Sequence, residues 1–504
     1  MTAIRTGQEN AIRKIAIIGG GTAGWMAAAA LSRMFGGTAV EIELVESDAI
    51  GTVGVGEATI PNIAQFNAML GLDEADFMAK THGTFKLGIE FVDWGRKGER
   101  YLHPFGNHGV DMDGIAFHQY HRAGGGDFGA IQNFSLSALA AKADKFSHPA
   151  PNPRNIRSQI GYAYHFDATK YAAYLRAYAE NGGVKRIEGK VVSVQQDGES
   201  GFVTDVTLES GASVAADLFI DCSGFRALLI GDTLEVDYQD WSRWLPCDSA
   251  LAVPTESSGS TPPYTRATAH DAGWQWKIPT QKRTGNGNVY ASGFTTDEAA
   301  RDTLIANLDG EMLAEPRQLR FTTGKRTRLW EKNVVALGLS GGFLEPLEST
   351  SIYLIQAGIS RLLSLFPDRG MSAVDRDEYN RLMDTEFAQI RDFLILHYHA
   401  TARDDSAFWN HVRTMSVPDS LNRKIELFRE GGRFFRYDGD LFTVTSWVAV
   451  FLGQGIVPKR YDPIVAAMPP DRVRESLASM RAAMKKAVET MPSHDDYLRK
   501  YCPA

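Results

Sequence analysis

The sequence predicts an α/β fold: a lobe with a parallel sheet, a β-rich region inserted into it, and a mostly helical C-terminal part. Residues 14–46 read as a short apolar strand, a glycine turn, a helix rich in Ala and Leu, and a second strand. Apolar strand-like segments of the same character return far along the chain, at 217–224 and 333–338. Helical periodicity dominates from about residue 352 onward.

The composition is that of an ordinary globular protein. The chain has 504 residues, of which 44% are hydrophobic and 23% charged, which excludes a disordered chain, a collagen and a coiled coil. The formal net charge of −8 argues against a general nucleic-acid binder. The three cysteines, Cys222, Cys247 and Cys502, are too few for a disulfide framework and indicate a reducing, cytoplasmic setting.

Two uncharged stretches superficially resemble export or membrane segments. Residues 15–31 are broken by glycines, which suits a tight turn better than an export helix. Residues 441–458 contain polar side chains and fall short of the roughly 20 apolar residues that a bilayer requires. We therefore expect a buried helix there and no membrane-spanning segment.

The strand-like segments are far apart in sequence, so we expect one lobe interrupted by two insertions. The first insertion is rich in His, Gly and aromatic residues and does not repeat the strand and helix pattern, so we expect long, irregular but ordered structure. The other insertion is expected to be mostly β-strand and loop. The lobe spans 1–365 with core pieces 14–60, 165–230 and 333–365, the insertions are 61–160 and 231–330, and the mostly helical part is 366–504.

The glycine turn predicts a dinucleotide site. Gly19, Gly21 and Gly24 match G-x-G-x-x-G after a strand and at the start of a helix. The first glycine permits a tight turn, the second lets the backbone approach a pyrophosphate, and the third lets helix and strand pack closely. Glu46 follows Gly24 by 22 residues, where an acid accepts a hydrogen bond from a ribose hydroxyl.

The later strands favour FAD over NAD. Residues 217–226 and 333–346 resemble the second and third flavin-contact regions of FAD-dependent aromatic hydroxylases. Gly338 is followed by Leu339 where that third region usually carries Gly-Asp, which points away from plain hydroxylases. The expected lobe is therefore an FAD-binding, Rossmann-like lobe of the aromatic-hydroxylase type. Its expected cofactor contacts are Gly19, Gly21, Thr22, Ala23, Gly24, Glu46 and Gly338.

Several motifs in order resemble those of the flavin-dependent tryptophan halogenases, over nearly the full length of the chain. The W-x-W-x-I-P motif is present without a mismatch. Segments 397–409 and 446–458 are also similar to that family. The four segments that carry the resemblance are GVGEATIP at 54–61, FKLGI at 85–89, WQWKIP at 274–279 and EPLEST at 345–350.

The resemblance implies a two-component oxidoreductase. A separate NAD(P)H-dependent flavin reductase would deliver reduced FAD, and O2 and a halide, bromide or chloride, would yield hypohalous acid. The hypohalous acid would move through an internal tunnel to a small aromatic substrate. The residues that match the family's catalytic lysine and glutamate are Lys86 and Glu348. From chemistry alone, a buried ammonium would polarise hypohalous acid and a buried amine would form a haloamine, while a carboxylate would take the proton from the ring.

The remaining site residues also follow from the resemblance. The backbone N–H groups of Thr350 and Ser351, at a predicted helix start, would bind the halide. Better-known members carry Gly at the position of Ser351. Whether this protein prefers chloride or bromide is therefore left open. Trp274 and Trp276 alternate along a strand and would share the face that separates flavin from substrate.

The first insertion supplies expected substrate contacts, and no metal site is expected. His103 and Phe105 sit where the family places a His and a Phe beside the aromatic substrate. The histidine pairs, His118 with His121 and His397 with His399, come with no acid or cysteine at a recognisable ligand spacing.

The substrate is expected to be an indole or substituted indole, or a peptide- or carrier-linked aromatic. Members that act on free tryptophan clamp its amino-acid end in the helical part, and residues 431–455 hold Phe434, Phe435 and Tyr437 but no recognisable Tyr-Tyr and downstream Glu pattern. An FAD-dependent aromatic monooxygenase and a non-catalytic flavin-binding protein remain alternatives. Lys86 and Glu348 favour the halogenase, because a hydroxylase does not require them.

Overall fold

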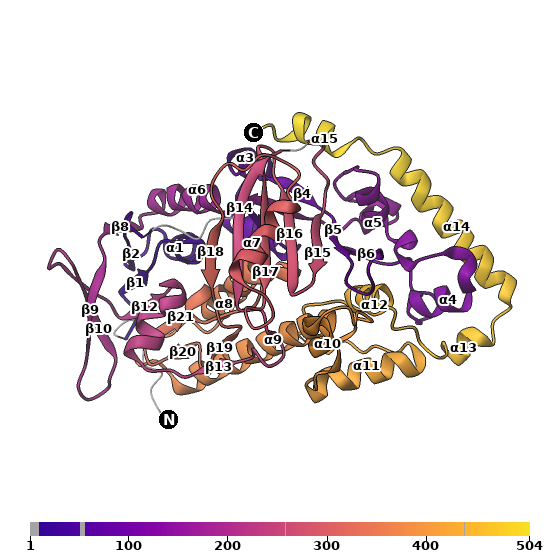
Figure 1. The fold of residues 1–504 in the computed structure, drawn as a ribbon. Coiled ribbons are helices and arrows are strands. Elements are labelled where there is room, and N and C mark those ends of the chain that lie inside the picture. Colours follow the sequence, from indigo (N-terminus) through magenta and orange to yellow (C-terminus); the bar gives the residue numbers. More distant parts are fainter. Residues whose placement is uncertain (1–9, 51–55, 258, 438) are drawn as a thin grey trace, which may run out of the picture.

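The computed structural model describes residues 10–50, 56–257, 259–437 and 439–504. A mostly parallel sheet at one end of the molecule and a larger, mostly antiparallel sheet in the middle form its frame, and helices occupy the opposite end (Figure 1). Residues 54 and 55, the first two of the motif at 54–61, lie outside the described residues.

The six-stranded sheet confirms the predicted α/β fold class. All its neighbouring strands are parallel except the β20–β21 pair. In the register, Ile15 of the first strand lies between Leu218 and Ile42. In the order of the sheet, the strands are β20 (Trp330–Glu331), β21 (Val334–Ala336), β12 (Leu218–Asp221), β1 (Lys14–Ile18), β2 (Glu41–Glu46) and β8 (Lys185–Glu188).

Helix α1 (Thr22–Phe35) starts at the glycine turn and packs on β1 and β2. It is buried over residues 24–32 because α6 (Ala168–Asn181) and α8 (Ser351–Ser364) also contact it. Its run of alanines lets these elements approach closely. The glycine turn is thereby held rigidly at the carboxyl end of β1.

The seven-stranded sheet joins the two insertions into one unit. All its strand pairs are antiparallel except the parallel pair β5–β15. The expectation that residues 61–160 are largely irregular was therefore wrong, because two of their segments pair with strands of the other insertion. In order, the strands are β18 (Arg317–Arg320), β14 (Ser249–Glu256), β17 (Arg283–Tyr290), β16 (Gly273–Pro279), β15 (Thr265–His270), β5 (Gly88–Val92) and β6 (Arg100–Pro104).

Three small sheets complete the β-structure. The first, in the order β3 (Gly56–Ala58), β7 (Ala163–Asp167) and β4 (Thr84–Lys86), contacts the large sheet and ends at the lysine predicted to be catalytic. The other two are β11 (Ser213–Ala215), β10 (Val203–Leu208) and β9 (Val191–Gln196), and β13 (Tyr238–Asp240), β19 (Gly324–Arg326) and β22 (Gly342–Phe343).

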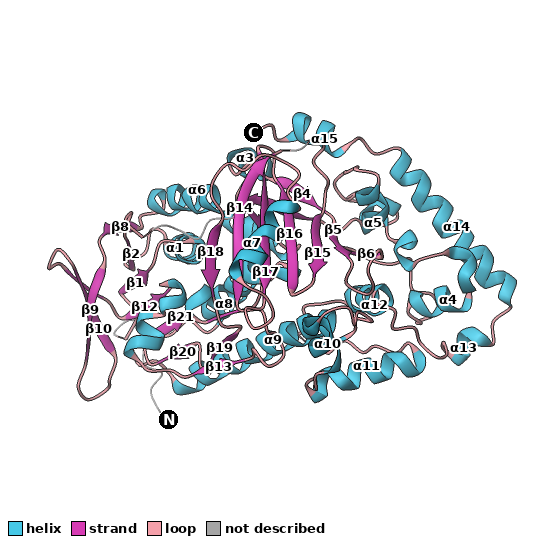
Figure 2. Cartoon of the chain, in the orientation of Figure 1, coloured by secondary structure: helices cyan, strands magenta, loops and turns pink. Residues whose placement is uncertain are grey.

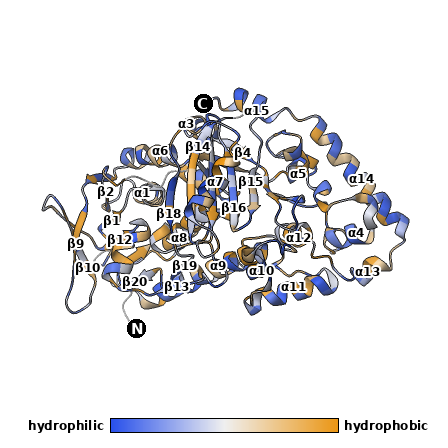
Figure 3. Cartoon of the chain, in the orientation of Figure 1, coloured by the Kyte–Doolittle hydropathy of each residue, from blue (hydrophilic) through white to orange (hydrophobic). Residues whose placement is uncertain are grey.

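The C-terminal part is helical, as expected (Figure 2). Hydrophilic residues dominate much of the long outer helix α14, whereas β14 in the interior is hydrophobic (Figure 3). Of the helices in the described residues, none is both long and apolar enough to cross a membrane. The remaining helices are α2 (Asn62–Leu70), α3 (Glu74–Lys80), α4 (Phe117–Ala123), α5 (Leu136–Lys142), α7 (Asp297–Ala306), α9 (Ala373–His399), α10 (Ala407–Thr414), α11 (Asp419–Gly431), α12 (Val444–Gly453), α13 (Pro463–Ala466), α14 (Pro470–Glu489) and α15 (His494–Tyr501).

Candidate active site

The glycine turn fits a dinucleotide. A Cβ at Gly19, whose φ is +112°, would overlap the Cys222 carbonyl, and a Cβ at Gly24 would overlap the Gly19 carbonyl. At Gly21, by contrast, a Cβ would meet nothing within 4 Å. Helix α1 starts there without a capping side chain, so no described side chain accepts from its first backbone N–H groups. This arrangement suits a pyrophosphate.

Glu46 and Gly338 both lie beside this turn. The Glu46 side chain lies against Gly20, and a Cβ at that glycine would overlap it. Its Oε1 accepts a hydrogen bond from Arg186 Nε at 2.6 Å, a partner that nothing in the sequence indicated. Gly338 has a φ of +71°, and a Cβ there would lie 2.9 Å from the Cβ of Ala23, so this segment approaches the start of α1 closely.

Lys86 ends β4 and is fully buried. Its Nζ donates hydrogen bonds to the Thr59 carbonyl at 2.9 Å and to Ser349 Oγ at 2.8 Å. Burial lowers the pKa of Lys86 to about 7, although the charge of Glu348 opposes the shift. The Phe105 ring centroid lies 5.1 Å from Nζ. The lysine therefore exchanges between ammonium and amine near neutral pH.

Glu348 lies between two histidines at the end of a single 3₁₀ turn, Pro346–Glu348. His103 Nδ1, from β6, lies 2.9 Å from its Oε2, and His397 Nε2, from the last turn of α9, lies 2.8 Å from its Oε1. Burial raises the pKa of Glu348, but the two histidines outweigh it and lower the pKa to about 2. The group is therefore a carboxylate at neutral pH.

His397 was not among the predicted site residues. Its Nδ1 lies 2.8 Å from the Phe393 carbonyl, which only accepts, so Nδ1 carries a proton. Its Nε2 faces the Glu348 carboxylate at an angle that makes no hydrogen bond. The His397–His399 pair was visible in the sequence, but nothing there linked it to an acid 49 residues earlier.

Ser349 connects the lysine to the acid. It is buried, follows Glu348 directly and has a φ of +61°, a left-handed conformation that is unfavourable for a residue with a side chain. This conformation brings its Oγ to Lys86 Nζ. Neither the contact nor the conformation was predictable from residue type.

The two tryptophans share one face of β16, with ring centroids 6.0 Å apart. Trp274 Nε1 donates to Glu345 Oε2 at 2.9 Å, and Tyr398 OH donates to the same oxygen at 2.6 Å. Burial raises the pKa of Glu345 to about 7. The first acid of EPLEST thus anchors Trp274, a contact that sequence reasoning missed. Trp276 lies over Gly287, where a Cβ would overlap its ring.

Thr350 and Ser351 form the start of α8. Thr350 is fully buried, and its Oγ1 has no hydrogen-bond partner in the described part of the chain. Helix α8 begins without a capping side chain, and neither N–H is hydrogen-bonded to a described residue. Free N–H groups at a helix start, beside an unpaired hydroxyl, suit an anion.

The expected substrate region is partly open. Phe434 stacks on Trp447 of α12 with centroids 5.1 Å apart, but Phe435 and Tyr437 are 56% and 53% exposed. Trp447 in turn contacts Phe393 at 4.9 Å. Two of the three aromatic residues noted in this segment are therefore more than half exposed.

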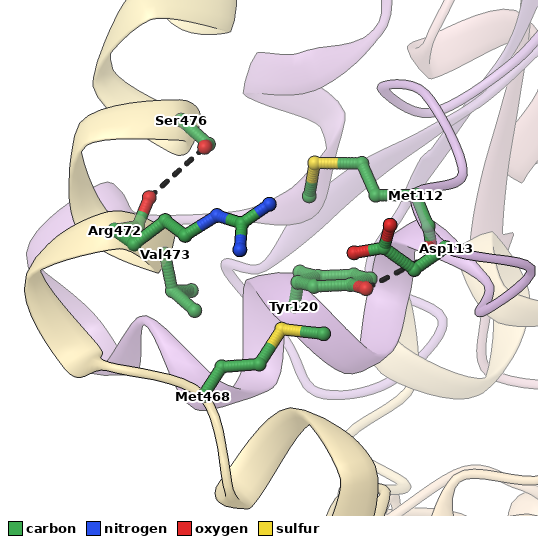
Figure 4. A pocket seen from close by; sticks show the side chains of 7 residues that line it. All are labelled: Met112, Asp113, Tyr120, Met468, Arg472, Val473 and Ser476. Carbon is green, nitrogen blue, oxygen red and sulfur yellow. Dashed lines mark hydrogen bonds between the residues drawn. The ribbon is translucent and has the colours of Figure 1, made fainter.

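A separate cavity of about 310 Å³ lies between α4, the loop before it, α14 and the loop that joins α13 to α14 (Figure 4). Its Tyr120 hydroxyl donates to the Met112 carbonyl, and Ser476 donates to the Arg472 carbonyl, so these polar groups bond locally. Its lining contains none of the predicted site residues. Across residues 10–50, 56–257, 259–437 and 439–504, no cluster of three or more His, Cys, Asp or Glu side chains is placed to hold a metal ion.

Comparison with known proteins identifies the family. The family profile described as tryptophan halogenase matches residues 14–470. The tryptophan 6-halogenase SttH of Streptomyces toxytricini is 35% identical, with 96% of this chain and 97% of that protein covered. The tryptophan 7-halogenase RebH of Lentzea aerocolonigenes is 34% identical, with 97% and 98% covered.

Solved structures agree with the family match. The flavin-dependent halogenase Xcc4156 from Xanthomonas campestris superposes with a TM-score of 0.94 at 49% identity, covering 98% of this chain and 99% of that one. The flavin-dependent halogenase BrvH from Brevundimonas sp. BAL3 gives 0.94 at 46% identity, covering 98% and 99%. The chain belongs to the tryptophan halogenase family and is an enzyme of the flavin-dependent halogenase type.

Proposed function

We propose that this enzyme halogenates an electron-rich aromatic, an indole or a substituted indole, by electrophilic substitution with hypohalous acid. The observation that carries the proposal is the buried pair Lys86 and Glu348, which Ser349 joins. Two relatives are named as halogenases of tryptophan, whose aromatic ring is an indole. The halide would be bromide or chloride.

Reduced FAD, when bound, would supply the oxygen chemistry that turns halide into hypohalous acid. The free N–H groups at Thr350 and Ser351 would hold the halide, and the buried rings of Trp274 and Trp276 would keep the organic substrate away from the flavin. A separate NAD(P)H-dependent flavin reductase would be the partner. The proposed cofactor contacts are Gly19, Gly21, Thr22, Ala23, Gly24, Glu46 and Gly338.

Lys86 would bind and polarise the hypohalous acid. An ammonium has three donors, and two of them are engaged by Thr59 and Ser349. The third would donate to the oxygen of the acid and make the halogen more electrophilic. With its pKa at about 7, the group is also an amine part of the time, which leaves the haloamine route chemically accessible.

Glu348 would accept the ring proton after the halogen has added. A carboxylate with a pKa of about 2 is a weak base, but the cationic ring intermediate is a strong acid, so weak basicity suffices. His103 and His397 would hold both oxygens in place. Phe105, beside Lys86, would pack against the substrate ring.

The substrate side supports an indole or a substituted indole over free tryptophan. Phe435 and Tyr437 are largely exposed instead of folded over the site. An open site accepts rings that lack the amino-acid end. A crystal structure with tryptophan enclosed by these side chains would contradict this assignment.

The test is a reaction of purified protein with FAD, NADH, a flavin reductase, bromide and indole, read by mass spectrometry. We expect a product with the paired isotope masses of bromine, lost in Lys86→Ala and absent without enzyme. An oxygenated product without halogen would replace this proposal with an aromatic monooxygenase.

A further inference from the structure

Glu46, the acid beside the glycine turn, has one carboxylate oxygen engaged and one free. Its Oε1 accepts a hydrogen bond from Arg186 Nε at 2.6 Å. Its Oε2 lies over the turn, so close to Gly20 that a Cβ there would overlap it. No residue that the structure describes donates a hydrogen bond to this second oxygen. The free oxygen therefore faces the place expected for the adenosine half of a dinucleotide.

Arg186 holds two further acids besides Glu46. Its Nη2 donates to Asp48 Oδ1 at 2.6 Å and to Glu188 Oε2 at 2.5 Å. The Asp48 N–H in turn donates to Glu188 Oε1 at 3.0 Å. The Arg186 side chain is only 15% exposed, and hydrogen bonds between charged groups are stronger where water is largely excluded. One guanidinium therefore joins three carboxylates beside the glycine turn.

The register of the parallel sheet explains why these groups meet. Glu46 of β2 and Glu188 of β8 are partners in the strand pair. Arg186 precedes Glu188 by two residues on β8, so the two side chains share one face of the sheet. Two neighbouring carboxylates repel each other, and a cation between them removes that repulsion. The position of the Glu46 carboxylate therefore depends on Arg186.

A second cation near Glu46 is less well placed to hold it. Arg176 Nη1, from α6, lies 3.6 Å from Glu46 Oε1. The same guanidinium donates from Nε to Glu180 Oε1 at 3.0 Å, and its side chain is 39% exposed. Loss of Arg186 would therefore leave the three acids without a cation at short range to join them.

The charge of Arg186 also matters for the ligand that the turn fits. A pyrophosphate at the start of α1 carries negative charge, and three carboxylates close to it would repel it. The guanidinium offsets part of that charge while its bond to Oε1 keeps Oε2 of Glu46 directed at the turn.

We propose that Arg186 is a positioning residue for FAD: it fixes Glu46 so that Oε2 accepts a hydrogen bond from a hydroxyl of the adenosine ribose. Arg186 acts through Glu46 and not by its own contact with the cofactor. The proposal rests on the proposed function, since it assumes that FAD occupies the glycine turn. It predicts that selectivity for an intact adenosine ribose depends on Arg186.

Titration by flavin fluorescence tests the proposal without turnover. The probes are oxidised FAD and the FAD analogue whose adenosine ribose lacks the 2′-hydroxyl. We expect wild type to bind FAD about tenfold tighter than the analogue, because a hydrogen bond to a charged group is lost. Arg186→Gln should reduce this ratio to about twofold, whereas a structural defect would weaken both ligands equally. Arg186→Lys should give an intermediate ratio, because an ammonium keeps the charge but lacks the planar fork that joins the three acids.

Two further variants show whether Arg186 acts through Glu46. In Glu46→Ala the ratio should be close to one, and the addition of Arg186→Gln should not change it. The matched control is Arg301→Gln, at an exposed arginine of α7 whose Nη2 lies 2.7 Å from Glu315 Oε2, and it should keep the wild-type ratio.

Equal binding of FAD and the analogue by wild type would overturn the proposal, and so would an unchanged ratio in Arg186→Gln. If Arg186→Gln does not fold, as judged by circular dichroism, Arg186→Lys decides, and a wild-type ratio in that variant overturns the proposal. No binding of FAD by wild type would overturn both this proposal and the proposed cofactor. The indole bromination assay judges the halogenase separately, so bromination together with an unchanged ratio in Arg186→Gln would overturn only the role of Arg186.

Discussion

The reacting centre differs from a cavity of about 490 Å³ that lies between α9, α11 and the loop after α11. At the centre, Lys86 and Glu348 are buried and their contacts come from within the protein. At the cavity, Phe435 and Tyr437 are more than half exposed and Arg423 is unpaired in the described structure. Fixed polar contacts at the reacting centre hold the catalytic groups in one arrangement. Substitutions in the exposed region can therefore change substrate selectivity without removing the catalytic groups.

Removal of the central cation should have the largest effect. Lys86→Ala should lower the rate of halogenation about 10²–10⁴-fold, because it removes the Nζ that lies 2.8 Å from Ser349 Oγ. Product formation is followed by mass spectrometry. Lys80→Ala, at an exposed lysine six residues earlier, is the control and should keep its activity. Near-normal turnover in Lys86→Ala would show that Lys86 has no catalytic role.

The burial of Lys86 should also appear in the pH dependence of stability. Its pKa falls from 10.5 to about 7 on folding, so between these values the unfolded chain binds a proton that the folded chain does not, and the free energy of unfolding rises with pH. Lys86→Met lacks this dependence. Relative to wild type, it should be more stable by on the order of a few kcal/mol at pH 6 and lose that advantage toward pH 10. Urea unfolding at several pH values measures this, and a difference independent of pH would contradict it.

His397 should have an intermediate effect through Glu348. His397→Gln should lower kcat about tenfold, since the carboxylate loses the imidazole whose Nε2 lies 2.8 Å from its Oε1. The two histidines hold the pKa of Glu348 at about 2, so without His397 this pKa rises and the acid limb of the kcat profile moves to higher pH. His399→Gln, two residues further along α9, is the control. A lower kcat with an unmoved acid limb would indicate a merely structural role.

The exposed loop should give the smallest effect. Phe435→Ala should change the KM for indole less than about twofold, because the ring is 56% exposed. Phe442→Ala, in the same loop but buried against Phe393, should raise KM by a larger factor. Equal, large increases in both variants would show that the loop closes over the substrate and would remove the contrast between the two regions.

Local patterns in the sequence determined much of this protein. The strand, glycine turn and helix at 14–35 predicted the α/β fold class, because turn glycines and hydrophobic periodicity act over a few residues. The motifs at 85–89, 274–279 and 345–350 pointed to the halogenase family, and the structure brings their side chains into one region.

Only the tertiary structure decided the contacts between distant segments. It joined β5 to β15 across the two insertions, placed His397 beside Glu348, connected Lys86 to Ser349, and bound Trp274 to Glu345. The partners in the last three contacts are 49, 263 and 71 residues apart along the chain. Residue type and spacing carry no information about such pairs, because burial and geometry arise only when the whole chain packs.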